Sequence, residues 1–141
     1  MTDDRPDLTV LDEAECWRLL GSVAVGRVAM EAAEGLVVVP VNYAVQDGDV
    51  VFRTTEGGLL GSAADWGRPV AFQVDSLDEG MRQGWSVLVR GELRRASEQD
   101  TPRLVELVAP WARGERNVVG RVKPSAVSGR RIGAGPGHPT S

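Results

Sequence analysis

The feature that most constrains this chain is a series of short apolar runs, several of which are joined by short hairpin-type connections. Residues 69–75 and 85–96 alternate apolar and polar side chains, which is typical of strands buried on one face. Asp47-Gly48 lies between two other apolar runs and is a hairpin turn signal. These patterns predict about six strands in an antiparallel barrel with helices packed on it, rather than a parallel nucleotide-binding sheet.

The same patterns predict where each element lies along the chain. Strands are expected at residues 22–30, 36–45, 50–54, 69–75, 85–96, 117–123 and 127–132. Helices are expected at residues 12–20, 58–66 and 97–109, with a polar loop at 76–83. We expect residues 1–10 to be a flexible N-terminus, residues 11–132 to form one domain and residues 133–141 to be a disordered tail.

Composition excludes several classes of function. The chain has 141 residues, a formal net charge of −4 and no basic run, which argues against a nucleic-acid partner. It has no membrane-length apolar stretch and no signal-peptide pattern at its start, so we expect no membrane partner and a cytoplasmic protein. With one cysteine, Cys16, and one histidine, His138, the chain offers no disulfide framework, Cys-His pair or zinc site.

The basic residues are almost all arginine, because Lys123 is the only lysine. An anion site must therefore be built from guanidinium groups, backbone amides or hydroxyls. The run from Val37 to Leu60 offers all three, since its second strand ends in Arg53-Thr54 and is followed by Gly57-Gly58. These are the groups that a phosphate-bearing cofactor needs.

Two further residues of the apolar strands invite an interpretation. Pro40 interrupts the run at residues 36–45, which indicates a sheet edge or a bulge beside a ligand. Arg27 lies inside an apolar strand, where a charge needs a partner. We expect it to pair with a carboxylate such as Asp75, or to contact a neighbouring subunit.

An ordered series of motifs resembles one protein family. The motifs are GRVA at 26–29, VPVNY at 39–43, VFRT at 51–54, VAFQVD at 70–75, GWSVLVRGE at 84–92 and PWA at 110–112. Over residues 11–132 the chain resembles the small bacterial members of the pyridoxamine phosphate oxidase-like flavoproteins, the split-barrel FMN-binding group. The resemblance implies a six-stranded split β-barrel that forms a homodimer, with flavin bound in two clefts between the subunits.

The resemblance also implies the residues that hold the cofactor, which would be FMN, another flavin or a deazaflavin. Arg53 and Thr54 would hold the phosphate together with the glycine turn. The VPVNY strand would run along the flavin ring, and Trp85-Ser86 would lie close to the same cleft. Arg131 would reach the neighbouring subunit's cofactor or end a strand in solvent. The full predicted set is Val39, Pro40, Val41, Asn42, Tyr43, Arg53, Thr54, Gly57, Gly58, Leu59, Trp85, Ser86 and Arg131.

One departure from the family pattern concerns the phosphate. Similar sequences carry Gly-Ser-Lys after the Arg-Thr strand, whereas this chain has Gly57-Gly58-Leu59-Leu60. Losing one charged hydrogen bond to phosphate costs about 1.5–3 kcal/mol, or roughly one to two decades of affinity. The chain would then bind FMN weakly, bind a related flavin, or have lost the cofactor.

Two functions follow from the sequence. The first is an FMN-dependent oxidoreductase that acts on a small organic substrate such as a quinone or nitro compound, with the flavin doing the chemistry and no catalytic side chain. The alternative is a non-catalytic flavin- or small-ligand-binding protein that has lost tight FMN binding. We expect no metal in either case.

Overall fold

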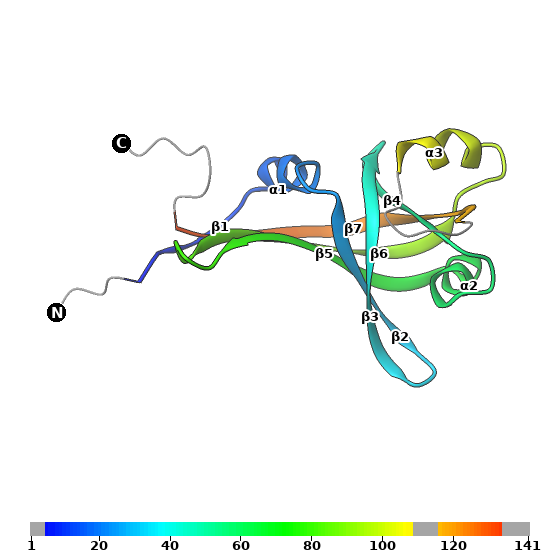
Figure 1. The fold of residues 1–141 in the computed structure, drawn as a ribbon, viewed down its shortest axis with the longest axis horizontal. Helices are drawn as coiled ribbons and strands as arrows, with labels where there is room; N and C mark the ends of the chain where they lie inside the picture. Colours follow the sequence, from blue (N-terminus) through cyan, green and yellow to red (C-terminus); the bar gives the residue numbers. More distant parts are fainter. Residues whose placement is uncertain (1–4, 109–115, 134–141) are drawn as a thin grey trace.

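The computed structural model describes residues 5–108 and 116–133, which form a closed antiparallel β-barrel with three short helices packed around it (Figure 1). The sheet order is β1-β7-β4-β3-β2-β5-β6, and β7 also pairs with β6. This last pairing closes a ring of six strands, and β1 adds to it as a seventh strand along β7. The predicted six-stranded barrel is therefore confirmed.

The elements have the following bounds. The strands are β1 Leu8–Val10, β2 Val25–Ala32, β3 Gly35–Gln46, β4 Asp49–Thr54, β5 Arg68–Asp78, β6 Gln83–Arg95 and β7 Val118–Ile132. The helices are α1 Glu13–Leu20, α2 Leu59–Trp66 and α3 Thr101–Leu107. No helix in the described ranges is long and apolar enough to cross a membrane.

The barrel interior is built from the residues that the period-two pattern singled out. Val70, Phe72 and Val74 of β5 are buried, as is the corresponding face of β6. The turn between β3 and β4 forms at Asp47-Gly48 with positive φ angles of 53° and 78°, as the hairpin signal predicted. Alternation and turn chemistry thus account for most of the barrel.

Helix α1 packs across β6 and β7 beside the barrel. Its N-cap is Asp12, whose carboxylate accepts the backbone N–H of Glu15 at 2.8 Å. The helix ends at Gly21, and its buried side chains are Cys16, Leu19 and Leu20, as predicted. A small residue is required beneath it, because a Cβ on Gly129 of β7 would lie 2.7 Å from the Cys16 sulfur.

Three predicted elements differ from the structure. The predicted loop at residues 76–83 is wrong, because strand pairing continues to Asp78↔Gln83 and leaves only a short turn at 79–82. Residues 76–78 are exposed and mostly polar, so they give no alternating hydrophobic pattern, although their backbone pairing is regular. The predicted strands at 117–123 and 127–132 are one strand, β7. Its Pro124 pairs with Gly91, next to a shift of register after Arg90, and such an irregularity tolerates a residue without an N–H.

The third difference is the start of α3, which begins at Thr101 rather than near Ser97. The Ser97 hydroxyl accepts the backbone N–H of Asp100 at 3.1 Å and so stabilises a preceding turn. Within the segment predicted to be flexible, Leu8–Val10 form β1 and pair with Arg130–Ile132. Residues 109–115 and 134–141, which include most of the predicted tail, lie outside the described ranges.

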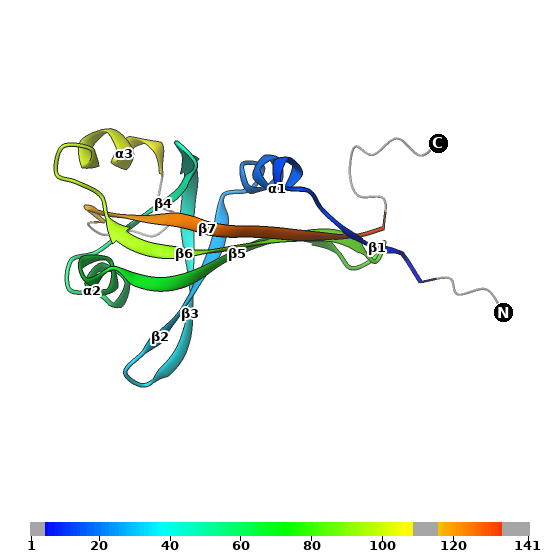
Figure 2. The same cartoon turned by 180° about the vertical axis from the view of Figure 1, so that it is seen from behind.

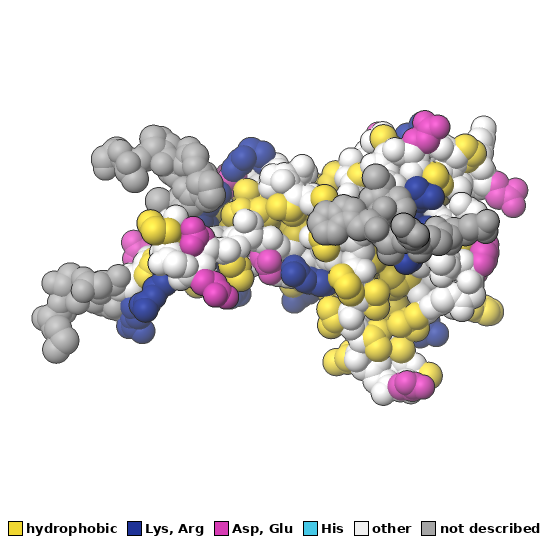
Figure 3. All heavy atoms as spheres, in the orientation of Figure 1, with side chains coloured by type: hydrophobic (Ala, Val, Ile, Leu, Met, Phe, Trp, Pro, Cys, Tyr) yellow, Lys and Arg dark blue, Asp and Glu magenta, His cyan; other side chains and the backbone are white. Residues whose placement is uncertain are grey.

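Two extensions project from the barrel (Figures 1 and 2). One is the long arm formed by the ends of β5 and β6 with β1 and β7, and the other is the β2–β3 hairpin. Residues 36–45 are nearly all apolar, yet Leu36 and Val38 are 85% and 65% exposed in the single chain. Hydrophobic side chains gather on the surface of this hairpin (Figure 3).

Because β2 packs closely on β5, we expect a larger side chain at Gly26 to destabilise the fold. A Cβ there would lie 2.3 Å from Phe72 Cζ and 2.9 Å from Val74 Cγ1. We expect Gly26→Ala to lower the free energy of unfolding by about 1–3 kcal/mol, because the buried ring must move. Gly80→Ala is the control, since its nearest neighbour atom is 3.5 Å away. Urea denaturation of both variants should separate them, and equal stability would contradict this account of the core.

Candidate functional site

A pocket of about 140 Å³ opens where β3, β4, α2 and the end of α3 meet. It brings together six of the predicted site residues, which come from two neighbouring strands. They are Val39, Pro40, Val41, Asn42, Arg53 and Thr54. Leu60, Val108 and Arg116 complete the lining, and none of these three was predicted from the sequence.

The pocket forms because β3 changes partners along its length. Residues 35–42 pair with β2, whereas pairing with β4 covers only Tyr43–Gln46. Among the described residues, the stretch around Pro40 therefore has a strand on one side only, as the proline predicted. Backbone and side chains of this stretch face the end of β4, where Arg53 and Thr54 lie.

Arg53 is the structural centre of the pocket. Its Nε donates to the backbone oxygen of Arg116 at 2.8 Å, and its Nη1 donates to the oxygens of Val108 at 3.2 Å and Val105 at 3.4 Å. The carbonyls at a helix C-terminus lack partners within the helix and carry partial negative charge, so a guanidinium stabilises them. Part of the predicted phosphate-binding group is thus used to hold the end of α3 and the residue that precedes β7.

Two cationic side chains and one hydroxyl group, from Arg53, Arg116 and Thr54, line the pocket. Of the lining residues that the structure describes, only Arg53 and Arg116 are charged, and both are positive. Thr54 is 7% exposed and is the one polar residue among the buried side chains of the described chain. A site with this donor set favours an anion. Arg116 was missed because it follows a helix without any local pattern, although an arginine close to a predicted strand start was a usable signal.

The glycine turn leads into α2 beside the pocket. Gly57 has a φ of 72°, and Gly58 is the N-cap of α2 without a side-chain cap hydrogen bond. The first N–H groups of an uncapped helix attract anions. Leu60 is buried in the pocket lining, whereas Leu59 is 45% exposed and does not line the pocket. The position at which the family resemblance implies a lysine is therefore an exposed leucine here.

Tyr43 does not line the pocket, although it belongs to the same strand. Its hydroxyl donates to the backbone oxygen of Leu20, and its ring contacts Phe72 edge-on at 4.8 Å between centroids. Burial raises the pKa of Tyr43 to about 12. In the single chain, Tyr43 ties the end of α1 to the barrel wall.

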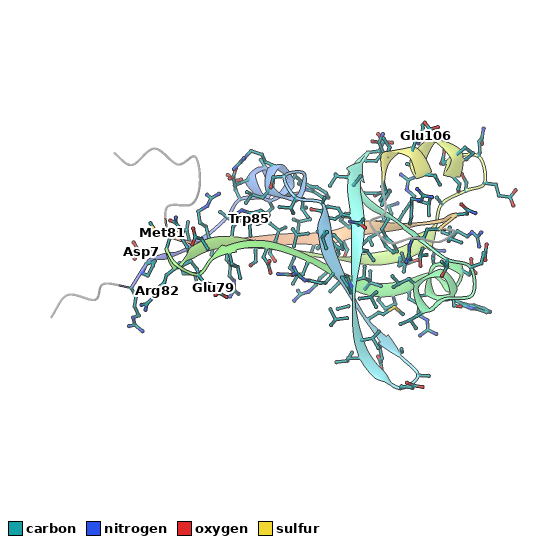
Figure 4. The ribbon with its side chains drawn as sticks, viewed as in Figure 1. Asp7, Glu79, Met81, Arg82, Trp85 and Glu106 are labelled. Carbon is teal, nitrogen blue, oxygen red and sulfur yellow. The ribbon has the colours of Figure 1, made fainter. Side chains whose placement is uncertain are left out.

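The remaining predicted residues lie on the long arm. Trp85 is buried where β6 pairs with β7 opposite Arg131, and Ser86 pairs opposite Arg130. Figure 4 shows Trp85 on the same arm as Met81 and Arg82, far from Glu106 of α3. A single chain therefore does not bring Trp85, Ser86 or Arg131 to the pocket.

Ion pairs stabilise this arm. Arg27 Nη1 lies 3.4 Å from Asp75 Oδ1, which confirms the predicted partner, and the same atom lies 3.4 Å from Gln73 Oε1. Arg131 is 11% exposed, and its Nη2 donates to Glu15 of α1 at 3.0 Å. Hydrogen bonds from Arg18 first and from Arg131 second lower the pKa of Glu15 from 4.5 to about 2.

No group of three or more His, Cys, Asp or Glu side chains is placed to hold a metal ion within residues 5–108 and 116–133. The donors at the pocket are cationic and suit an anionic ligand instead.

Comparison with known proteins adds to this geometry. The sequence profile of the family described as Pyridoxamine 5'-phosphate oxidase matches residues 12–131. The uncharacterized protein Rv0080 of Mycobacterium tuberculosis is 37% identical over 131 residues, which span 89% of this chain and 86% of that protein.

Two solved structures are similar in both sequence and fold. The FAD binding protein of Mycobacterium smegmatis is 38% identical, with a TM-score of 0.68, over 89% of this chain and 98% of that one. The conserved protein DIP1874 of unknown function from Corynebacterium diphtheriae is 27% identical, with a TM-score of 0.71, over 89% of this chain and 98% of that one.

The hydrogen bonds that Glu15 accepts from Arg18 and Arg131 predict a defined pH dependence. Because the pKa of Glu15 is lower in the folded chain, its stabilising effect is complete above pH 4.5 and is lost as the pH falls toward about 2. We expect Glu15→Gln to unfold with a shallower pH dependence than the parent across this window. Glu13→Gln makes the same charge change on the same helix and is the control. Identical acid denaturation curves for the parent and Glu15→Gln would contradict the assignment.

Proposed function

Because this chain belongs to the pyridoxamine 5′-phosphate oxidase family, we propose that it binds a flavin whose phosphate lies in the pocket between β3, β4 and α2. One observation supports this proposal more strongly than the others. Arg53 and Thr54, which the family resemblance assigned to the phosphate, line one pocket together with Val39 to Asn42 of the strand assigned to the ring, whereas Gly57 and Gly58 do not line it. Among its described lining residues are two arginines and no acidic side chain.

The donor set fits a phosphate group. A guanidinium presents N–H donors that match phosphate oxygens, and the uncapped start of α2 adds backbone dipoles of the same sign. Arg53 and the Thr54 hydroxyl would hold the phosphate, and Val39, Pro40 and Val41 would lie along the ring. The flavin would supply hydride or electron transfer, while these residues bind and orient it.

The pocket of one chain is too small for the whole cofactor. Its volume is about 140 Å³, whereas ligand sites commonly measure about 300–1,000 Å³. The flavin ring would therefore extend over the unpaired side of β3, which the described residues of one chain leave open to solvent. A second copy of the chain would cover it, which supports the predicted homodimer.

The exposed β2–β3 hairpin supports the same arrangement. A hollow of about 520 Å³ lies between this hairpin, β5 and β6, with apolar lining residues that include Leu36 and Val38. An apolar surface of this kind marks a contact with another protein. One part of the proposal requires the second copy, namely the contacts predicted between the cofactor and Trp85, Ser86 and Arg131.

The flavin is FMN or FAD in this proposal, with a deazaflavin as a further candidate. Both flavins carry the phosphate that the arginines would bind, and the relative from Mycobacterium smegmatis at 38% identity is an FAD binding protein. The substrate would be a small organic molecule, such as a quinone or nitro compound, that reaches the exposed ring face and is reduced or oxidised there. No side chain of the pocket is needed as a nucleophile.

A non-catalytic flavin- or small-ligand-binding protein is the second candidate. Two observations favour it, namely the leucine in place of the family lysine and the use of Arg53 Nε and Nη1 by backbone oxygens. Both observations predict weaker phosphate binding. Turnover of a quinone or nitro compound by the flavin-loaded protein would decide against this candidate.

Purified protein tests the cofactor directly. We expect visible flavin absorbance in protein purified without added cofactor, and release of FMN or FAD on denaturation. If the protein is purified without cofactor, flavin at 100 times its Kd should stabilise the fold by about 2.7 kcal/mol. Colourless protein whose melting temperature does not respond to riboflavin, FMN or FAD would disprove the proposal.

The dimer can be tested separately. We expect a particle of about twice the 15.1 kDa chain mass in light scattering after size-exclusion chromatography. Val38→Asp should shift the protein toward the monomer, because a charge would be buried in the apolar contact. Leu107→Asp places the same charge on the exposed side of α3 and should leave the mass unchanged. A monomeric parent protein would rule out the second copy as the cover of the ring.

A further inference from the structure

We infer that Arg116 is the second phosphate-binding cation of this chain and takes the place of the lysine that related sequences carry after the glycine turn. The inference rests on the proposed flavin function and assigns a residue outside the motifs that suggested it. Arg116 lies just before β7, far in sequence from Gly57-Gly58.

The charge of the pocket is the first observation. The chain is acidic overall, with a net charge of −4, yet the described residues of the lining include two arginines and no carboxylate. Within the described ranges, Arg116 forms no ion pair with an acidic side chain, although most other arginines of the barrel do. Two neighbouring cations without a counter-charge favour binding of an anion with more than one charged oxygen.

The position of Arg116 is the second observation. Strand β4 pairs with β7 in the register Arg53↔Val119 and Thr54↔Val118, which brings the start of β7 to the end of β4. The hydrogen bond from Arg53 Nε to the Arg116 backbone oxygen, at 2.8 Å, then fixes residue 116 at the pocket. The same barrel closure that places Arg53 therefore also places Arg116.

The third observation concerns the side-chain hydrogen-bond donors that each arginine does not use within the described structure. Arg53 uses Nε and Nη1 for backbone oxygens, which leaves only part of its five-donor fork for a ligand. Arg116 donates no side-chain hydrogen bond to a described residue. Leu59, at the lysine position, is exposed and outside the lining. The cation that the turn lacks is thus supplied to the pocket by the segment that precedes β7.

Binding of flavins with and without phosphate tests this assignment. Riboflavin, FMN and FAD would be titrated into cofactor-free parent protein, Arg116→Ala and Arg116→Lys, with the Kd read from flavin fluorescence. We expect Arg116→Ala to weaken FMN binding about 10- to 100-fold and to change riboflavin binding less than about twofold. Arg116→Lys should lie between the two, because lysine keeps the charge but not the fork.

A rescue and a control make the test specific. Adding Leu59→Lys to Arg116→Ala should recover at least about tenfold in FMN affinity, because it restores a cation at the family position. Arg68→Ala removes the same charge from an exposed residue outside the pocket and should leave all three affinities unchanged.

The outcomes separate the inference from the function on which it rests. If the parent binds FMN and Arg116→Ala binds it equally well, the role of Arg116 is disproved and the flavin function stands. If Arg116→Ala weakens riboflavin as much as FMN, the residue is structural and the inference also fails. A parent protein that binds none of the three flavins would overturn both proposals.

Discussion

The pairing of β7 on both of its edges is the constraint on which the rest of the molecule depends. Along one edge β7 pairs with β6 from Gly120 to Ile132, and along the other it pairs first with β4 and then with β1. This double pairing closes the barrel. It also brings the end of β4 to the start of β7, so the pocket exists only when the barrel is closed.

Arg53 links this closure to the chemistry of the pocket. Its bonds to Val105, Val108 and Arg116 oxygens stabilise the end of α3 and the entry into β7, so the residue contributes to the fold as well as to the site. A ligand that depended on Arg53 alone would compete with those carbonyls for its donors. A second arginine on the same wall removes that conflict, since one guanidinium can maintain the structure while both contribute positive charge.

Sequence patterns predicted the parts of the fold that depend on local periodicity. The alternation in β5 and β6, the Asp47-Gly48 turn and the helix predicted at residues 12–20 all depend on residues close together in the chain, and each is confirmed. The strand pairing at residues 76–83 was not predicted because its side chains are mostly polar and exposed, and the backbone hydrogen bonds leave no sequence pattern. Arg116 was missed because its place in the pocket results from the register of β4 on β7, which no local pattern reveals.

The size of the pocket indicates which part of the ligand one chain would bind and which part a second copy would cover. A cavity of about 140 Å³ with two arginines can recognise a phosphate within a single chain. The ring of the same ligand would meet the unpaired side of β3, and its outer surroundings would come from another copy. Changes at the phosphate pocket should then alter how tightly the cofactor is held, whereas changes on the β2–β3 hairpin should alter how well the ring is covered. The two properties are separable because they depend on different surfaces of the barrel.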